Sequence, residues 1–136
     1  MNLCHDCITL IDEDGCTRYN GPSVDEVCLL EMCHDSGLGE FKKRDATSYK
    51  ISVRDEIETY QILKVFEFTS ERKAMSVIVK HPSKVNRAIC FVKGADSAIF
   101  PLCSGKSEEV ERSVEAMAKK GLRTLLYASK EIYWDG

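Results

Sequence analysis

The stretch "ETYQILKVFEF" (residues 58–68) decides the fold class of this chain. Its apolar residues alternate between the two faces of an extended strand: one face takes Tyr60, Ile62, Phe66 and Phe68, and the other takes Leu63 and Val65. Alternation with a period of two residues is typical of a β-strand that is buried on at least one face. We therefore predict a strand here, with Phe66 packed in the core and Phe68 at the end of the strand.

Further strand-like segments surround this one in the sequence. The stretches "AMSVIVK" (74–80) and "AICFVK" (88–93) follow it, separated by the polar loops "TSERK" and "HPSKVN". Loops of this length connect neighbouring antiparallel strands. A further strand is expected before them in "DATSYKISVR" (45–54), and "LRTLLYAS" (122–129) returns to strand character near the end. The segments predict an antiparallel meander.

The first of two predicted helices runs from Ser23 to about Ser36. Ser23 is a good N-cap, and Glu26 stands three residues later, which is the spacing of a capping box. The apolar and half-polar positions at helical spacing are Val27, Leu30 and His34, and Gly37 supplies the stop.

The second predicted helix follows Ser107, which can cap it. An apolar stripe at helical spacing is formed by Val110, Val114 and Met117, and the segment "KKG" ending at Gly121 closes the helix in the preferred order. An antiparallel sheet flanked by helices is an α+β domain. A chain of 136 residues is long enough for one such domain, which we place at residues 1–136.

Composition narrows the functional classes. The chain is 43% hydrophobic and 30% charged, as expected of a folded soluble domain. A net charge of −3 argues against a nucleic-acid binder, which would need a basic surface. We expect no membrane insertion of this segment, because its apolar runs are only a few residues long, and no secretory signal at "MNLCHDCITL".

The cysteines indicate a reduced environment or, as an alternative, a zinc site. Their number is seven, and their spacing does not resemble a disulfide framework, so we predict reduced, cytosolic thiols. The pair in "CHDC" has zinc-like spacing, and a structural zinc would need four ligands. A zinc-stabilised interaction module would use Cys4, Cys7, Cys33 and His34.

Lys93 stands directly after the predicted strand "AICFV", at a junction where a lysine must either reach water or meet an anion. No glycine-rich phosphate loop, GxGxxG, HExxH or nucleophile elbow occurs in the chain. A nucleotide bound here would therefore not be wrapped in backbone amides. Gly94, which directly follows Lys93, is expected to keep the backbone slim beside a ligand.

Four stretches in this order resemble the nucleotide-binding domain of P-type ATPases: "YNGPSVDEVCLL", "VFEFTSERKAMSVIV", "FVKGADSAIF" and "KKGLRTL". In that family the last three read approximately EFxSDRKxMSV, KGA and GLR, and the first resembles the SPDE segment of the phospholipid-flippase class. "LCH" near the start also fits that class. The sequence departs from the pattern at Val24, Glu71 and Ala74.

The resemblance implies a nucleotide-binding site. Phe68 would stack on adenine, a contact worth about 1–3 kcal/mol. Lys93 would attract the phosphates or line the adenine pocket, and Arg123 would contact the phosphates with a planar guanidinium. Met75 would pad the pocket. The other proposed contacts come from the predicted helix start, where Glu26 either accepts the adenine amino hydrogen or closes the capping box, and Asp25 is a neighbouring candidate.

The resemblance also implies what the rest of the parent protein does. The chain lacks the phosphorylated-aspartate motif DKTGT, the dephosphorylation loop TGES and any transmembrane helix. We expect a domain on the cytoplasmic side of a membrane ATPase that holds ATP and presents the γ-phosphate to a separate phosphorylation domain. Mg²⁺ would be bound through the phosphates and that other domain, and this segment would hold no metal and no catalytic residue. Expected partners are the phosphorylation and actuator domains and an accessory subunit. A cation-transporting parent is the alternative to a lipid-transporting one.

Overall fold

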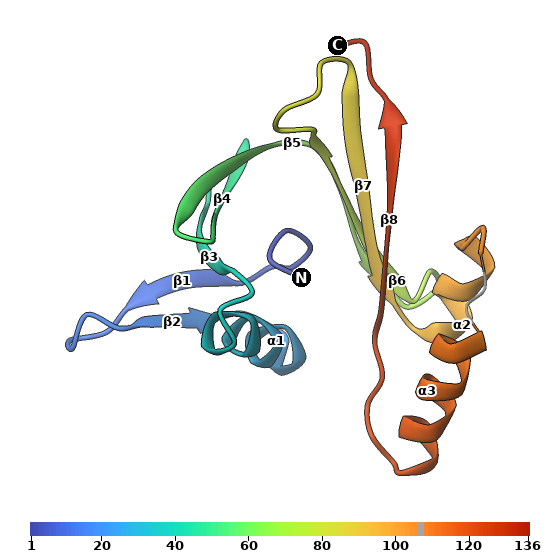
Figure 1. Ribbon diagram of the computed structural model, residues 1–136. Helices are drawn as coiled ribbons and strands as arrows, with labels where there is room; N and C mark the ends of the chain where they lie inside the picture. Colours follow the sequence, from blue (N-terminus) through green and yellow to red (C-terminus); the bar gives the residue numbers. More distant parts are fainter. Residues whose placement is uncertain (106–107) are drawn as a thin grey trace.

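The computed structural model describes residues 1–105 and 108–136 (Figure 1). The N-terminal half contains β1 (Ile8–Ile11), β2 (Thr17–Asn20), α1 (Val24–Asp35), β3 (Glu40–Arg44) and β4 (Ser48–Val53). The second half contains β5 (Glu56–Thr69), β6 (Ala74–Lys80), β7 (Arg87–Gly94), α2 (Asp96–Ile99), the 3-10 turn η1 (Phe100–Leu102), α3 (Glu108–Lys119) and β8 (Leu126–Tyr133). The α+β class predicted from the sequence is confirmed.

The main sheet is a six-stranded antiparallel meander in the order β3-β4-β5-β6-β7-β8. A separate two-stranded hairpin, β1-β2, precedes α1. The predicted strands in residues 45–54, 58–68, 74–80 and 88–93 are all present, and the last predicted strand begins later, at Leu126. Sequence reasoning missed β1, β2 and β3; in β3 the short run "FKKR" contains one fully buried residue, Phe41, followed by basic ones.

β5 is the element that joins the two halves of the sheet. Its first half pairs with β4, and its second half pairs with β6, on the two sides of a bend (Figure 1). The extra residue at this bend is Leu63, because Ile62 pairs with Val79 and Lys64 already pairs with Ile78. A β-bulge of this kind bends the strand and shifts its side-chain alternation by one residue.

This bulge overturns the predicted strand faces. Tyr60 and Ile62 pack against the core before the bulge, and Val65 packs against it afterwards. Phe66 therefore falls on the other face and is 42% exposed, so the prediction that Phe66 lies in the core was wrong. The guanidinium of Arg72 instead lies over the Phe66 ring, 5.7 Å from the ring centroid.

The helices begin and end largely where the capping residues indicate. In α1 the Ser23 side chain accepts a hydrogen bond from the backbone N–H of Glu26. Gly37 follows the helix with a φ of +68°, a conformation that costs glycine little. Cys33, rather than the predicted His34, joins Leu30 on the buried face.

α3 ends at Lys119, and Gly121 follows it with a φ of +73°. Of its predicted apolar stripe, Val114 is buried and Met117 is partly exposed. The predicted N-cap, Ser107, lies outside the described residues. Within the part of the chain that is described, no helix is long and apolar enough to cross a membrane.

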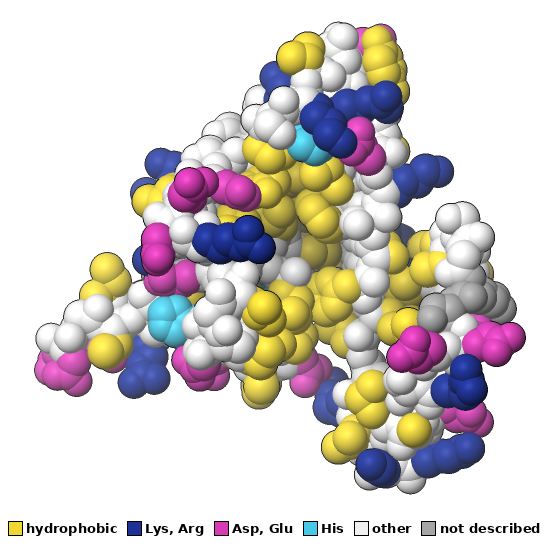
Figure 2. Space-filling model, in the orientation of Figure 1, with side chains coloured by type: hydrophobic (Ala, Val, Ile, Leu, Met, Phe, Trp, Pro, Cys, Tyr) yellow, Lys and Arg dark blue, Asp and Glu magenta, His cyan; other side chains and the backbone are white. Residues whose placement is uncertain are grey.

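The core lies between the N-terminal half and the inner face of β6 and β7. Hydrophobic side chains gather in the hollow between the two halves of the molecule (Figure 2). The buried cluster contains Leu3, Cys4, Cys7, Tyr19, Leu30, Phe41, Tyr49, Ile51, Met75, Val77 and Val79. Because Lys93 is the register partner of Met75, its side chain lies on this core-facing side of the sheet.

Gly94 is required by its own chain. A Cβ on Gly94 would lie 2.3 Å from the carbonyl oxygen of Lys73 and 2.9 Å from the Cα of Ala74. The slim backbone predicted to make room for a ligand is therefore needed first by the neighbouring strand. We expect Gly94→Ala to lower the free energy of unfolding by about 2 kcal/mol, since backbone atoms must move.

The measurement is urea denaturation of Gly94→Ala beside a matched variant, Gly105→Ala. An added Cβ at Gly105 meets nothing within 4 Å, so we expect a change of no more than about 0.5 kcal/mol there. Equal stability of both variants would show that the close approach at Gly94 is not real.

Candidate functional site

Lys93 forms a buried ion pair with Glu26. Lys93 stands near the end of β7 and is 6% exposed, an unusual burial for a lysine. Its ammonium contacts the carboxylate of Glu26, which comes from the first turn of α1 and is also largely buried. A charged group that is buried away from water requires a partner of opposite charge. The anion met by this strand-end lysine is thus a carboxylate of its own chain.

Both carboxylate oxygens of Glu26 are engaged. Oε1 accepts from Lys93, while Oε2 accepts from the backbone N–H of Asp6 at 3.1 Å and lies 3.9 Å from the thiol of Cys7. The Ser23 hydroxyl accepts the N–H of Glu26 at 3.4 Å. Ser23 therefore caps the helix, but the Glu26 side chain does not return the bond, and the capping-box interpretation of that side chain was wrong.

Asp25 forms a second ion pair beside the first. Arg123 Nη2 lies 2.7 Å from Asp25 Oδ2, and both side chains are exposed. Asp25 precedes Glu26 in α1, and Arg123 lies in the segment that leads into β8. The first turn of α1 is thus connected by ion pairs to β7 and to the segment before β8, two regions distant in the sequence.

Phe68 lies at the same end of the sheet as Lys93. The register joins Thr69, Ala74, Gly94 and Leu126 in one row across four strands, and Phe68 directly precedes that row. A second bulge makes two residues of β5, Glu67 and Phe68, oppose the single residue Met75. Bulges beside binding sites re-aim side chains. Phe68 is 60% exposed, so it leaves a free aromatic surface there rather than packing in the core.

Met75 is placed differently from the other candidates. Its side chain is 1% exposed and belongs to the core cluster, next to Lys93 in the register. It can shape this end of the sheet only by packing beneath it, in the usual manner of a core methionine.

Sequence reasoning missed a group of polar residues around Glu26. Asp6 accepts a hydrogen bond from Arg44 Nη1 at 2.8 Å, and Glu67 lies beside it. Partial burial and the neighbouring Asp6 carboxylate raise the pKa of Glu67. The stretch "CHDC" contained the signal for this group, but its cysteine spacing pointed to zinc instead. Cys7 packs on Gly21, where an added Cβ would lie 2.6 Å from the sulfur.

The residues proposed for zinc have other partners. The Cys4 thiol donates to the carbonyl of Met75 at 3.7 Å, Cys33 lies 3.9 Å from the sulfur of Met1, and His34 pairs with Glu40 at 3.9 Å. Among residues 1–105 and 108–136, no group of three or more His, Cys, Asp or Glu side chains could hold a metal ion.

His5 is buried without a compensating negative charge in direct contact, and its protonation should be coupled to folding. Burial lowers the pKa of His5 to about 4. Its Nδ1 accepts the N–H of Cys7 at 3.0 Å, so Nε2 carries the proton and donates it to the Asn2 carbonyl at 3.1 Å. A proton added at Nδ1 would point at the backbone N–H of Cys7, so two donors would face each other.

The pKa of His5 is lower in the folded chain than its unfolded value near 6.5. The contribution of neutral His5 to the free energy of unfolding is therefore complete above about pH 6.5 and is lost as the pH falls to about 4. We expect a loss of about 3 kcal/mol over this window. Urea denaturation at several pH values, compared with His5→Asn, isolates the effect because the carboxylates are common to both chains. Parallel pH profiles of the two proteins would contradict it.

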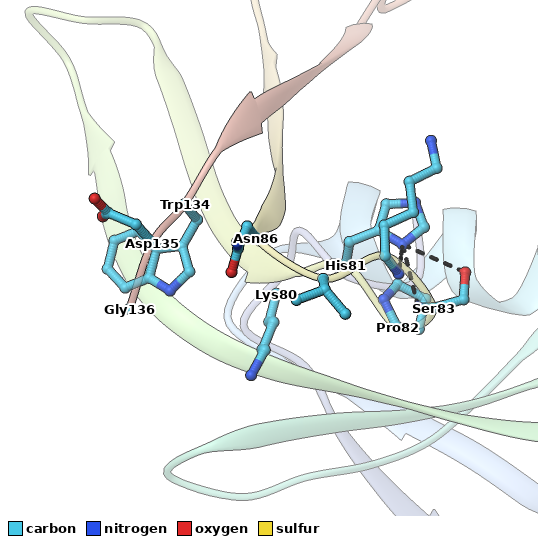
Figure 3. A pocket seen from close by; sticks show the side chains of 10 residues that line it. Lys80, His81, Pro82, Ser83, Asn86, Trp134, Asp135 and Gly136 are labelled. Atoms are coloured by element: carbon cyan, nitrogen blue, oxygen red, sulfur yellow. Dashed lines mark hydrogen bonds between the residues drawn. The ribbon is translucent and has the colours of Figure 1, made fainter.

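One cavity lies away from these residues. It has a volume of about 290 Å³ and is lined by the β6–β7 loop and the last residues of the chain, including His81 and Trp134 (Figure 3). Arg87, which begins β7 beside it, is at the opposite end of that strand from Gly94. A second cavity, about 190 Å³, lies between the N-terminal residues, Phe91 and Tyr127. Tyr127 is the register partner of Lys93, but neither Lys93 nor Glu26 lines this cavity.

Known proteins match this chain over most of its length. The family described as "P-type ATPase, cytoplasmic domain N" matches residues 1–136. A phospholipid-transporting ATPase from Schizosaccharomyces pombe is 35% identical over 136 residues, covering 97% of this chain and 10% of the relative. Phospholipid-transporting ATPase IH from Homo sapiens is 37% identical over 115 residues, covering 84% of this chain and 10% of the relative.

A probable phospholipid-transporting ATPase 7 from Arabidopsis thaliana is 37% identical over 141 residues, covering 97% of this chain and 11% of the relative. The chain thus spans about a tenth of the length of the curated relatives it matches. The match extends over the whole meander and both ion pairs. The chain belongs to the family of the cytoplasmic N domain of P-type ATPases.

Proposed function

We propose that this domain binds ATP at the end of the sheet where Phe68, Lys93 and the first turn of α1 meet. The observation that carries the proposal is the buried Lys93–Glu26 pair beside the exposed Phe68 ring, in a chain of the N-domain family. An aromatic face, a fixed cation and a fixed carboxylate are the groups that adenine and its phosphates need.

Each residue has a separate role in this site. Phe68 stacks on the adenine ring. Glu26 accepts from the adenine amino group, and Lys93 orients that carboxylate and adds positive potential. Arg123 exchanges its exposed partner Asp25 for a phosphate, which offers two oxygens to the guanidinium. Met75 supports the site from the core.

The parent protein is proposed to be a phospholipid-transporting ATPase. Its relatives named above all carry that description, which favours a lipid over a cation as cargo. In such a protein this domain positions ATP, and an aspartate in a separate phosphorylation domain receives the γ-phosphate. Mg²⁺ is bound by the phosphates and by that domain. The other partners are the actuator domain and an accessory subunit, on the cytoplasmic side of the membrane.

Binding by the isolated domain is expected to be weak. The site has no glycine-rich cradle for the phosphates, and a dissociation constant of about 1 mM corresponds to roughly −4 kcal/mol. The isolated domain is expected to bind ATP without hydrolysing it. Calorimetric or NMR titration with ATP tests this, and submicromolar affinity or the absence of binding at about 10 mM would contradict the proposal.

Arg123→Ala separates phosphate contacts from adenine contacts. We expect this variant to bind ATP about tenfold more weakly and adenosine with unchanged affinity, because the guanidinium contacts only phosphate. Stability should change by less than about 1 kcal/mol, since the Asp25 pair is exposed. NMR titrations with ATP and adenosine are the measurement. An equal loss of affinity for both ligands would move Arg123 out of the phosphate subsite.

A further inference from the structure

The N-terminal turn, defined here as Leu3–Cys7, lies across the core-facing side of the sheet. Four of its residues are buried: Leu3, Cys4, His5 and Cys7. The Cys4 thiol donates to the carbonyl of Met75, which pairs with Lys93 in the register. The turn therefore packs directly on the part of the sheet that carries the proposed nucleotide site.

His5 fixes the conformation of this turn from inside. The ring is 2% exposed, with Nδ1 accepting the N–H of Cys7 at 3.0 Å and Nε2 donating to Asn2 at 3.1 Å. Its edge-on neighbours are the rings of Phe41 at 4.4 Å and Tyr49 at 5.9 Å between centroids. These two hydrogen bonds and two aromatic contacts restrict the ring to one orientation, and the ring in this way fixes the turn.

The N-terminal turn also holds the side chain of Glu26. Along the chain, Asp6 lies between Asn2 and Cys7, the two residues that His5 bonds. The backbone N–H of Asp6 donates to Glu26 Oε2 at 3.1 Å. Arg44 Nη1 braces the same peptide region, donating to the carbonyl of His5 at 3.3 Å and to the Asp6 carboxylate at 2.8 Å. With Oε2 held in this way, Oε1 is directed to Lys93.

We propose that His5 is a positioning residue of the nucleotide site, which fixes the N-terminal turn so that the Asp6 N–H orients the Glu26 carboxylate on Lys93. The proposal rests on the proposed function. A charged side chain that must meet both a lysine and an adenine amino group needs a fixed direction, and a backbone N–H supplies it without side-chain entropy. His5 itself does not touch the ligand.

Two amide variants test this role. His5→Asn places its Oδ1 where Nδ1 stands and keeps the bond to the N–H two residues on, as in an Asx-turn. His5→Gln has the same amide one methylene farther out, so it keeps a donor toward Asn2 but loses the acceptor for Cys7. The two variants are matched in polarity: His5→Asn keeps the bond to Cys7 and gives up the bond to Asn2, whereas His5→Gln does the reverse.

The first readout is the ¹H–¹⁵N spectrum without ligand. We expect the Asp6 amide to keep its carboxylate-bonded downfield shift in His5→Asn and to lose it in His5→Gln. The second readout is ATP affinity, expected within about twofold of the parent sequence in His5→Asn and about fivefold weaker in His5→Gln. Equal affinities in both variants, or an unchanged Asp6 amide in His5→Gln, would overturn the positioning role.

The unmodified chain supplies a third readout if His5→Gln fails to fold. On adding ATP, the Asp6 and Cys7 amides should shift with the same saturation midpoint as the Lys93 amide, and the absence of such shifts would overturn the proposal. Failure of the proposed function is distinguishable: no residue of the unmodified chain would then respond to ATP, while the Asp6 amide in the ligand-free variants would still decide whether His5 orients Glu26.

Discussion

Replacing Phe68 with alanine is expected to weaken ATP binding by about tenfold to a hundredfold, because base stacking on an aromatic ring contributes about 1–3 kcal/mol. The fold should tolerate the change. Phe68 is 60% exposed and stands outside the core cluster, so its truncation removes little buried area. We expect the free energy of unfolding to fall by less than about 1 kcal/mol. NMR titration with ATP and urea denaturation measure the two effects on the same sample.

Phe66→Ala is the matched control for this variant. Phe66 stands two residues earlier in the same strand and is also partly exposed, but the bulge at Glu67 and Phe68 separates the two rings in register. Phe66 contacts Arg72 and should not contact adenine. ATP affinity should therefore stay within about twofold of the parent sequence. If Phe66→Ala weakens ATP as much as Phe68→Ala does, the adenine site has been placed on the wrong face of β5.

Breaking the Lys93–Glu26 pair is expected to have the largest effect on stability. Lys93→Met and Glu26→Gln each leave one buried group without its charged partner, and such changes cost about 3–5 kcal/mol. A domain of this size has only about 5–15 kcal/mol to lose. We expect both single variants to unfold at clearly lower urea concentration than the parent chain.

The double variant Lys93→Met/Glu26→Gln separates stability from binding. Both charges are then gone, so we expect it to recover at least about half of the loss seen in either single variant. ATP binding should not recover, because the cation and the carboxylate are both missing. Urea denaturation and an ATP titration of the three variants are the measurements. Single variants within about 1 kcal/mol of the parent sequence would show that the pair is not buried as described.

Local patterns predicted most of the fold. The strands 45–54, 74–80 and 88–93 and the cap at Ser23 follow from alternation and capping chemistry, which act over a few residues. Two features could not be predicted in that way. The bulge at Leu63 changes the face of the residues that follow it in β5, up to the second bulge at Glu67 and Phe68, and no turn residue or glycine near Leu63 indicates it. β3 was hidden because "FKKR" contains a single buried residue, Phe41, among exposed basic ones.

The candidate site could be predicted only in part. The motifs around Phe68, Lys93 and Arg123 named residues that the fold brings to one end of the sheet, with Asp25 and Glu26 forming ion pairs to two of them. No motif could predict that the Asp6 N–H bonds Glu26, because a backbone contact across twenty residues leaves no trace in side-chain types. Sequence reasoning assigned no role to His5, because the zinc-like spacing in "CHDC" directed attention to its two cysteines.

The measurement that tests the central claim most directly is a two-dimensional amide NMR titration of the unmodified domain with ATP up to about 10 mM. The account predicts saturable shifts near Glu26, Phe68, Lys93 and Arg123, with a midpoint of about 1 mM and with the β6–β7 loop around His81 unchanged. Shifts confined to that loop, or no shifts at any of the four residues, would contradict the account.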